Sequence, residues 1–159
     1  MLKKKKCNVI MRKVRKMKKL AIFSAILVII ICGVFYLYLN YSAQYNNSKK
    51  ANLKFENYLN VEVYGTDLAT VINRAIDNNQ QNEVEVNNKG IYLDNDENSI
   101  SIEIKMLDND SIYQMETIYN GGIQNFINYY SNIKFKCVEI KYHSSTNKVK
   151  YMLFEQITQ

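Results

Sequence analysis

A predominantly apolar run extends from Leu20 to Leu39, and this run is the strongest pattern in the chain. Its twenty residues carry no charge. At about 1.5 Å per helical residue they reach roughly 30 Å, the thickness of a bilayer's hydrocarbon core. Because backbone groups in lipid must satisfy their own hydrogen bonds, the run predicts one membrane-spanning helix.

After Gly65, apolar residues are spaced as on one face of an α-helix. Apolar residues recur there at i, i+3, i+4, i+7 and i+8, which predicts an amphipathic helix with one buried stripe. The stripe consists of Leu68, Val71, Ile72, Ala75 and Ile76. We expect Thr66 to cap the free backbone amides and Asp67 to lie favourably at the positive end of the helix dipole. The polar run Asn78 to Asn82 is expected to end the helix.

Shorter helices are predicted on either side of this one. Residues 53–60 carry Phe55, Tyr58 and Leu59 at helical spacing, and residues 123–130 show a similar face after the breaker Gly121-Gly122. Residues 112–119 fit a helix or a strand equally well.

Alternation with period two predicts strands in the second half of the chain. It is clearest over residues 100–106, and it flanks the turn-like residues 87–90 in the manner of a hairpin. Residues 133–142 also alternate, but the phase changes after Cys137. Either both faces are covered there, or a bulge shifts the phase. After a turn at residues 144–148, residues 149–154 predict a closing strand.

The predicted fold class is α+β, with an N-terminal transmembrane helix followed by a small domain that has an antiparallel β-sheet and two or three helices. We expect a basic cytoplasmic tail at 1–19, the transmembrane helix at 20–39, a stalk at 40–52, and an extracytoplasmic domain at 53–159. About 120 residues after the span suffice for one domain with its own core.

The charge distribution predicts the orientation of the span. Residues 1–19 hold ten Lys or Arg and no acid, whereas the chain after Leu39 holds eleven Lys or Arg against fifteen Asp or Glu. Basic residues that flank a first span stay in the cytoplasm, so residues 40–159 are expected outside. The formal net charge of +6 is therefore a property of the short tail.

Three other interpretations of the first forty residues fit less well. A cleaved signal peptide would have an apolar region of roughly 7–15 residues and a small-residue cleavage site, but Tyr41-Ser42-Ala43 places a bulky Tyr at the outer position. A lipoprotein would need a small residue before its acylated cysteine, and Ile31 precedes Cys32. A pilin-like leader would show Gly just before the apolar run and Glu inside it, and neither is present.

The basic tail is expected to act mainly as a topology signal. It can also attract anionic lipid, at about 1 kcal/mol for each well-placed Lys or Arg. No nucleic acid partner is expected, because the tail has no interleaved aromatic residues.

His143, the single histidine, is the first candidate for chemistry. A triad needs a base held between a nucleophile and an orienting acid, and sequence neighbours such as Ser144 and Ser145 on a turn rarely have that geometry. We expect a structural or surface histidine and no catalytic residues.

Two acidic clusters resemble calcium ligands. Asp94-Asn95-Asp96-Glu97-Asn98 begins like an EF-hand loop, but Ser99 replaces the required Gly and Lys105 replaces the final Glu. The second cluster, Asp108-Asn109-Asp110, is expected near the opposite end of the intervening strand, roughly 30 Å away. We therefore expect solvated turns, with no metal and no cofactor.

The three cysteines fall in three predicted compartments: Cys7 inside, Cys32 in the membrane and Cys137 outside. No intramolecular disulfide and no zinc site is expected. Cys137 shares a strand face with Phe135, which favours a buried thiol. An intermolecular bridge through Cys137 is the alternative.

Two blocks of the sequence carry a family resemblance. The first is Gly65-Thr66-Asp67-Leu68, with Ile72-Asn73 and Ile76-Asp77-Asn78-Asn79 behind it, and the second is Phe135-Lys136-Cys137-Val138-Glu139-Ile140-Lys141-Tyr142-His143 with the closing strand. Together they resemble a group of short single-span bacterial membrane proteins of unknown function, over most of residues 50–157. This resemblance implies no activity and no site residues.

These patterns favour a non-catalytic interaction or structural protein, anchored in a bacterial plasma membrane by one span and displaying its domain on the outer face. Its expected partners are the bilayer and either an unknown protein or another copy of the chain. A pilin-like or envelope-machinery subunit is the alternative, and an envelope enzyme is the weakest interpretation, since no paired acids or phosphate-binding loop are present.

Overall fold

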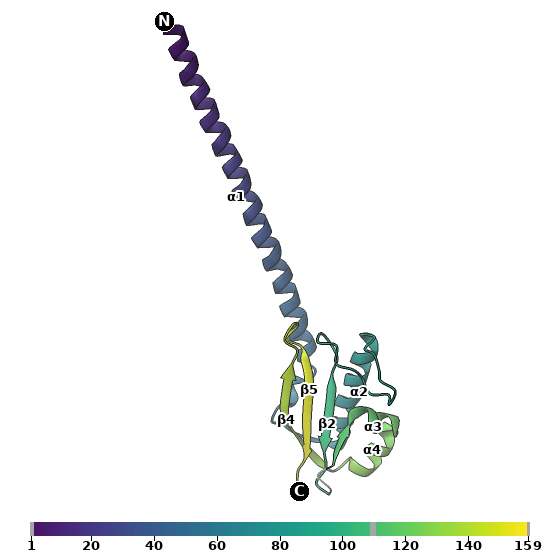
Figure 1. Cartoon of the computed structure of the whole chain (residues 1–159). Helices are drawn as coiled ribbons and strands as arrows, with labels where there is room; N and C mark the ends of the chain where they lie inside the picture. The colour runs from purple at the N-terminus through teal and green to yellow at the C-terminus, as the bar shows by residue number, and fades with distance from the viewer. Residues whose placement is uncertain (1, 109–110, 159) are drawn as a thin grey trace. The chain divides into compact units, whose positions relative to one another are not determined.

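The chain begins with one helix, α1 (Leu2–Asn52), which contains the whole apolar run (Figure 1). The computed structural model describes residues 2–108 and 111–158, with side chains for residues 15–108 and 111–158. Two compact units are distinguished, Met1–Ala43 and Gln44–Gln159. Within the described part of the chain, one helical segment near the N-terminus, Arg15–Asn52, is long and apolar enough to cross a membrane. Residues 20–39 are therefore helical, as predicted.

The second unit is a small domain that combines a sheet with three α-helices. After the last residues of α1, its elements are η1 (Glu56–Tyr58), β1 (Glu62–Tyr64), α2 (Gly65–Gln81), β2 (Ser101–Lys105), β3 (Ile112–Gln114), α3 (Met115–Asn120), α4 (Ile123–Tyr130), β4 (Lys134–Tyr142) and β5 (Val149–Gln156). The helices α2, α3 and α4 lie against the sheet in Figure 1.

The sheet is mixed, so the prediction of an antiparallel sheet is wrong at one pairing. The strand order is β1-β4-β5-β2-β3, and β2 pairs with β5 in parallel, for example Glu103 with Leu153. The other pairings are antiparallel. Alternation reports which face of a strand is buried but not which strand lies beside it. Here β3, α3, α4 and β4 form the long crossover that a parallel pair requires.

The core lies between the sheet and α2, and it follows the predicted stripes. All five residues of the helical stripe are buried, as are Ile102 and Ile104 of β2. Phe135 and Phe154 close the core from β4 and β5 and are fully buried. Burial of each such side chain contributes about 1.5–3 kcal/mol, so this cluster supplies the main stabilisation of the domain.

The start of α2 differs from the prediction. The helix begins at Gly65, Tyr64 is its N-cap residue, and no side chain caps it, so the assignment of Thr66 as cap is wrong. A Cβ on Gly65 would lie 2.1 Å from the Tyr130 carbonyl oxygen, and the Gly65 amide donates to the Ile133 carbonyl at 3.0 Å. Close contact with the end of α4, and not a side-chain cap, therefore fixes this helix start.

Three predicted segments are only partly formed. Residues 53–60 contain the short 3-10 helix η1 in place of an α-helix. The hairpin around residues 87–90 reduces to a turn with one antiparallel bridge, Val86 to Tyr92. Residues 112–119 contain both predicted alternatives, since β3 passes directly into α3.

The change of phase in β4 is a bulge, as one of the two alternatives predicted. The register with β5 shifts between Cys137 and Glu139, which leaves Val138 as the extra residue. Cys137 is fully buried, whereas Val138 is exposed.

Candidate functional site

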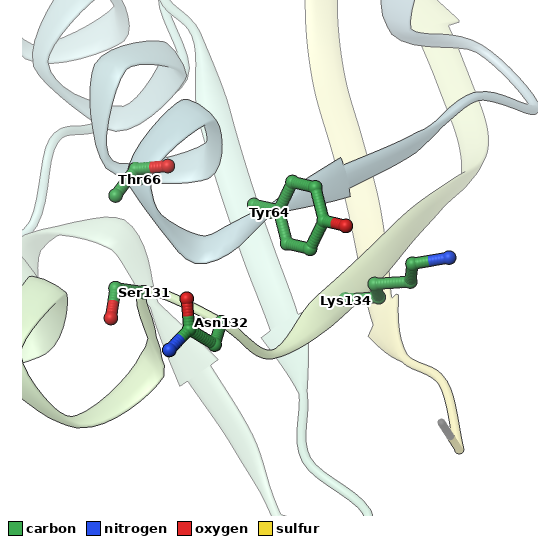
Figure 2. Close-up of a pocket in the computed structure, with 5 residues that line it drawn as sticks. All are labelled: Tyr64, Thr66, Ser131, Asn132 and Lys134. Atoms are coloured by element: carbon green, nitrogen blue, oxygen red, sulfur yellow. The ribbon is translucent and has the colours of Figure 1, made fainter.

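A groove lies beside the first turn of α2 (Figure 2). Its volume is about 550 Å³. Figure 2 shows that its side chains come from β1, the start of α2, the connection after α4 and the start of β4. They are Tyr64, Thr66, Ser131, Asn132 and Lys134.

The groove combines hydroxyl, phenol and amide groups with one cation. The Lys134 ammonium lies 3.1 Å from the Glu62 carboxylate, and this partner raises the pKa of Lys134. His143 follows the C-terminal end of β4, whereas Lys134 of the groove begins that strand, so His143 is not part of the groove. The groove can therefore bind polar groups, but its described residues do not pair a nucleophile with a base.

A second polar region, here named the polar junction, joins the end of α1 (residues 44–52), the loop 94–99 and the turn 143–148. Ser48 Oγ donates to the Thr146 carbonyl at 2.6 Å. Asn52 Nδ2 donates to the Asn147 carbonyl at 2.9 Å, and its Oδ1 accepts the Val149 amide at 2.9 Å. Ser48 and Asn52 are both buried, so the helix end is fixed to the β4–β5 turn by bonds shielded from water.

The loop 94–99 is fixed to the same turn from the other side. Ser145 Oγ donates to the Asp96 carbonyl, and Thr146 Oγ1 donates to the Glu97 carbonyl, each at 2.5 Å. Three segments distant in sequence thus meet at one turn.

An ion pair at this loop involves Asp94 and Lys150. The Lys150 ammonium contacts the Asp94 carboxylate and lies 3.9 Å from that of Asp96. The hydrogen bond from Lys150 lowers the pKa of Asp94, and the same contact raises the pKa of Lys150. Both groups are partly exposed, so we expect this pair to contribute no more than about 1 kcal/mol to stability.

His143 is buried within the polar junction. Its Nε2 lies 2.7 Å from the Ser99 carbonyl oxygen, which requires the proton on Nε2. Its Nδ1 has no hydrogen-bond partner among the described residues and lies 4.0 Å from Asp94 Oδ1. The imidazole connects the turn to the loop through Ser99. Among the described residues its ring nitrogens form no hydrogen bond with Ser144 or Ser145, so these neighbours do not form a triad with it.

The first acidic cluster is a loop held by its own amide groups. Asn95 Oδ1 accepts the backbone amides of Glu97, Asn98 and Ser99, and the Asp94 carboxylate is occupied by Lys150. Of the second cluster, Asn109 and Asp110 lie outside the described residues. Within the described residues, no group of three or more His, Cys, Asp or Glu could hold a metal ion.

The cysteines differ in environment. Cys137 is fully buried, and burial raises the pKa of its thiol to about 11. Cys32 is exposed on α1, and the side chain of Cys7 lies outside the described ones. The prediction of a buried thiol at Cys137 is therefore confirmed, and a buried, neutral thiol is unreactive.

Among the described residues, the burial of five polar side chains was not predicted from the sequence: Ser48, Asn52, Asn79, Ser99 and Glu116. Asn79 continues the apolar stripe of α2 at the next helical position after Ile76, and this spacing is the signal that could have identified it. Ser48 and Asn52 are four residues apart and therefore share one face of α1, but their polar surroundings in sequence hide that face.

Comparison of the chain with protein families, with curated proteins and with solved structures gives no match.

Proposed function

We propose that this chain is a membrane-anchored, non-catalytic interaction or structural protein that displays its α+β domain on the outer face of a bacterial plasma membrane. The observation that carries the proposal is the exposure of α1. Every residue from Leu20 to Leu39 is exposed, with values for the large side chains from 50% at Ile26 to 73% at Phe23.

Such exposure is costly in water. Each large apolar side chain left uncovered forgoes about 1.5–3 kcal/mol of burial, and the run contains more than a dozen of them. A bilayer covers all sides of a single helix at once, and the helix satisfies its own backbone. Lipid is therefore the solvent that best fits this segment.

The orientation follows from the basic tail. Ten Lys or Arg in residues 1–19 favour a cytoplasmic N-terminus, which places the domain outside. The same charges provide contact with anionic lipid on the cytoplasmic side.

A pair of topology reporters tests the anchor and its orientation. Alkaline phosphatase, active only outside, and a green fluorescent protein that fluoresces only inside are each fused after Gln159. We expect phosphatase activity, no fluorescence, and retention of the chain in membranes after alkaline extraction. As a matched control, the same reporters fused after Lys19 should show the opposite pattern. Fluorescence after Gln159, or release of the chain by alkali, would overturn the proposal.

A pilin-like or envelope-machinery subunit is the second candidate. The observation in its favour is that α1 leads from an apolar run into a domain and is hydrogen-bonded there to the β4–β5 turn. N-terminal sequencing of the mature chain separates the two candidates. A new start just before residue 20 would favour assembly into a filament, whereas an intact N-terminus favours the anchor.

A further inference from the structure

His143 is a buried imidazole with one ring nitrogen unused. The hydrogen bond from Nε2 to the Ser99 carbonyl oxygen, at 2.7 Å, places the single proton of the neutral ring on Nε2. Nδ1 then carries a lone pair, is shielded from water, and has no hydrogen-bond partner among the described residues. It lies 4.0 Å from Asp94 Oδ1, which is also an acceptor. Two acceptors thus face each other, and neither supplies a proton.

We propose that His143 is a proton-dependent switch of the polar junction, in which a proton taken up at Nδ1 is donated to the Asp94 carboxylate and binds the loop 94–99 more tightly to the turn 143–148. The proton comes from water, and the resulting imidazolium donates from both ring nitrogens. A hydrogen bond from a cation to a carboxylate is about twice as strong as a neutral one. Histidine is the side chain whose charge ordinarily changes between about pH 5 and 8.

The charges around the imidazole decide whether it accepts the proton. On the segments that meet at the polar junction and on the elements that flank it, these are Asp94, Asp96 and Glu97 of the loop, Lys148 of the turn, Lys150 of β5, Lys49 and Lys50 of α1, Glu56 of η1 and Asp77 of α2. Among the described residues, the Asp94 carboxylate alone lies within 4.0 Å of the ring. The Lys150 ammonium contacts the other oxygen of that carboxylate, so Lys150 opposes protonation without occupying Oδ1.

Asp94 is suited to accept this proton. The hydrogen bond from Lys150 lowers the pKa of Asp94, so the carboxylate stays charged while an imidazole titrates. Asp94 Oδ1 already accepts the Asp96 amide at 3.1 Å and the Ser99 hydroxyl at 3.3 Å. The amide holds the carboxylate beside the ring, whereas the hydroxyl can rotate away and leave room for the imidazole N–H.

The switch acts at the place where α1 ends. Carbonyl groups of the turn 143–148 accept hydrogen bonds from Ser48 and Asn52, so tighter binding of the loop to this turn also stabilises the attachment of the helix end. Under the proposed anchoring, the imidazole responds to the pH outside the cell. This last point rests on the proposed function, whereas the protonation of His143 does not.

Nuclear magnetic resonance of the single histidine tests the protonation step. Because the chain contains one histidine, the imidazole signals of an untagged chain are assigned without ambiguity. The full chain in detergent, with isotope-labelled histidine, is followed between about pH 8 and 5. We expect a neutral ring with its proton on Nε2, and a second proton at Nδ1 as the pH falls. A ring that keeps one protonation state over this range would overturn the proposal.

Charge variants test the partner. Asp94→Asn keeps an oxygen that can accept the Asp96 amide but removes the charge, so the midpoint of the His143 titration should fall by about one pH unit or more. Lys150→Gln removes the opposing cation and should raise the midpoint. Asp67→Asn, which neutralises an exposed carboxylate in the first turn of α2, is the matched control and should leave the midpoint unchanged. Equal midpoints in the wild type and the Asp94 variant would overturn the proposed contact.

Hydrogen exchange tests the effect on the loop. Opening of the loop separates Asp94 from the imidazole, so by linkage the proton should favour the closed loop by the factor by which Asp94 favours the proton, roughly tenfold for one pH unit. Protection of the amides at residues 95–99, corrected for the intrinsic pH dependence of exchange, should rise by this factor from about pH 8 to pH 5. His143→Gln keeps a donor for the Ser99 carbonyl but takes up no proton, so its protection should stay constant.

Constant protection in the wild type, or the same rise in the His143 variant, would overturn the switch. Both measurements use the purified chain. Their failure is therefore distinct from a failure of the membrane anchor, which the topology reporters test.

Discussion

At the scale of single residues, the domain uses buried amide side chains as substitutes for backbone. Asn79 donates to the Ile100 carbonyl and accepts the Ile100 amide, each at 2.8 Å. It thus presents to Ile100 the donor and acceptor that a neighbouring strand would offer. Since Asn79 and the groups it binds are buried, no water can replace it.

Replacing Asn79 by Leu should therefore lower the free energy of unfolding by about 2–4 kcal/mol, because two buried backbone groups lose their partners. Urea denaturation of the full chain in a mild detergent, followed by circular dichroism, measures the change. Gln80→Leu is the control: Gln80 is the next residue of α2 and is exposed, and its replacement should cost less than about 0.5 kcal/mol. Equal stability of the Asn79 variant and the wild type would show that these bonds contribute nothing.

The thiol of Cys137 predicts a dependence of stability on alkaline pH. Burial raises its pKa from 9.0 to about 11, so between these values the folded state binds more protons than the unfolded state. Stability from this group is fully present below pH 9 and is lost as pH rises toward 11.

We expect the free energy of unfolding to fall more steeply between pH 9 and 11 for the wild type than for Cys137→Ala. Tyr151, whose pKa is raised by burial and by Glu103, contributes equally to both proteins. The difference in slope therefore isolates the thiol, and parallel slopes would contradict its burial as the cause.

At the scale of elements, one turn is the meeting point of segments that the sequence separates widely. Carbonyl groups of the β4–β5 turn accept hydrogen bonds from Ser48 and Asn52 at the end of α1. On its other side, the turn donates hydrogen bonds from Ser145 and Thr146 to the loop 94–99. Residues 44–52 thus belong to the same compact unit as the sheet.

Replacing Asn52 by Ala should detach this helix end from the turn. It removes the partners of the Asn147 carbonyl and the Val149 amide, and we expect a loss of about 2–4 kcal/mol together with faster hydrogen exchange of the Val149 amide. Exchange measured by mass spectrometry on the full chain should show the effect at residues 143–149. Lys49→Ala, one turn away and exposed, should leave exchange there unchanged. Unaltered protection in the Asn52 variant would contradict the role of this contact.

At the scale of the whole molecule, the chain divides into a basic, apolar N-terminal part and a mildly acidic domain. The ten cations before Leu20 and the acidic balance after Leu39 are separated by the exposed apolar run. Under the proposed anchoring, this asymmetry sets which end of the chain is translocated.

Neutralising the four basic residues nearest the run should therefore weaken the orientation. With Arg15, Lys16, Lys18 and Lys19 all changed to Gln, we expect a mixture of both topologies and a measurable loss of phosphatase activity from the fusion after Gln159. The matched control changes the four remote residues Lys3, Lys4, Lys5 and Lys6 to Gln, with a smaller effect. An unchanged reporter in the first variant would contradict a topological role for these charges.

The sequence by itself determined most of the elements, because apolar periodicity is a local property. The α2 stripe and the alternation in β2 follow from neighbouring residues and were predicted, and the bulge in β4 is one of the two alternatives that the change of phase left open. Where local signals were equal, as at residues 112–119, the chain uses both a strand and a helix.

The tertiary structure alone decided which segments became neighbours. The parallel pairing of β2 with β5 and the burial of Asn52 and Asn79 depend on contacts between residues far apart in the chain. Periodicity shows which face of a strand is buried but not which strand pairs with it. The pairing depends on how much apolar surface it buries, set against the entropic cost of closing the loop between the two strands.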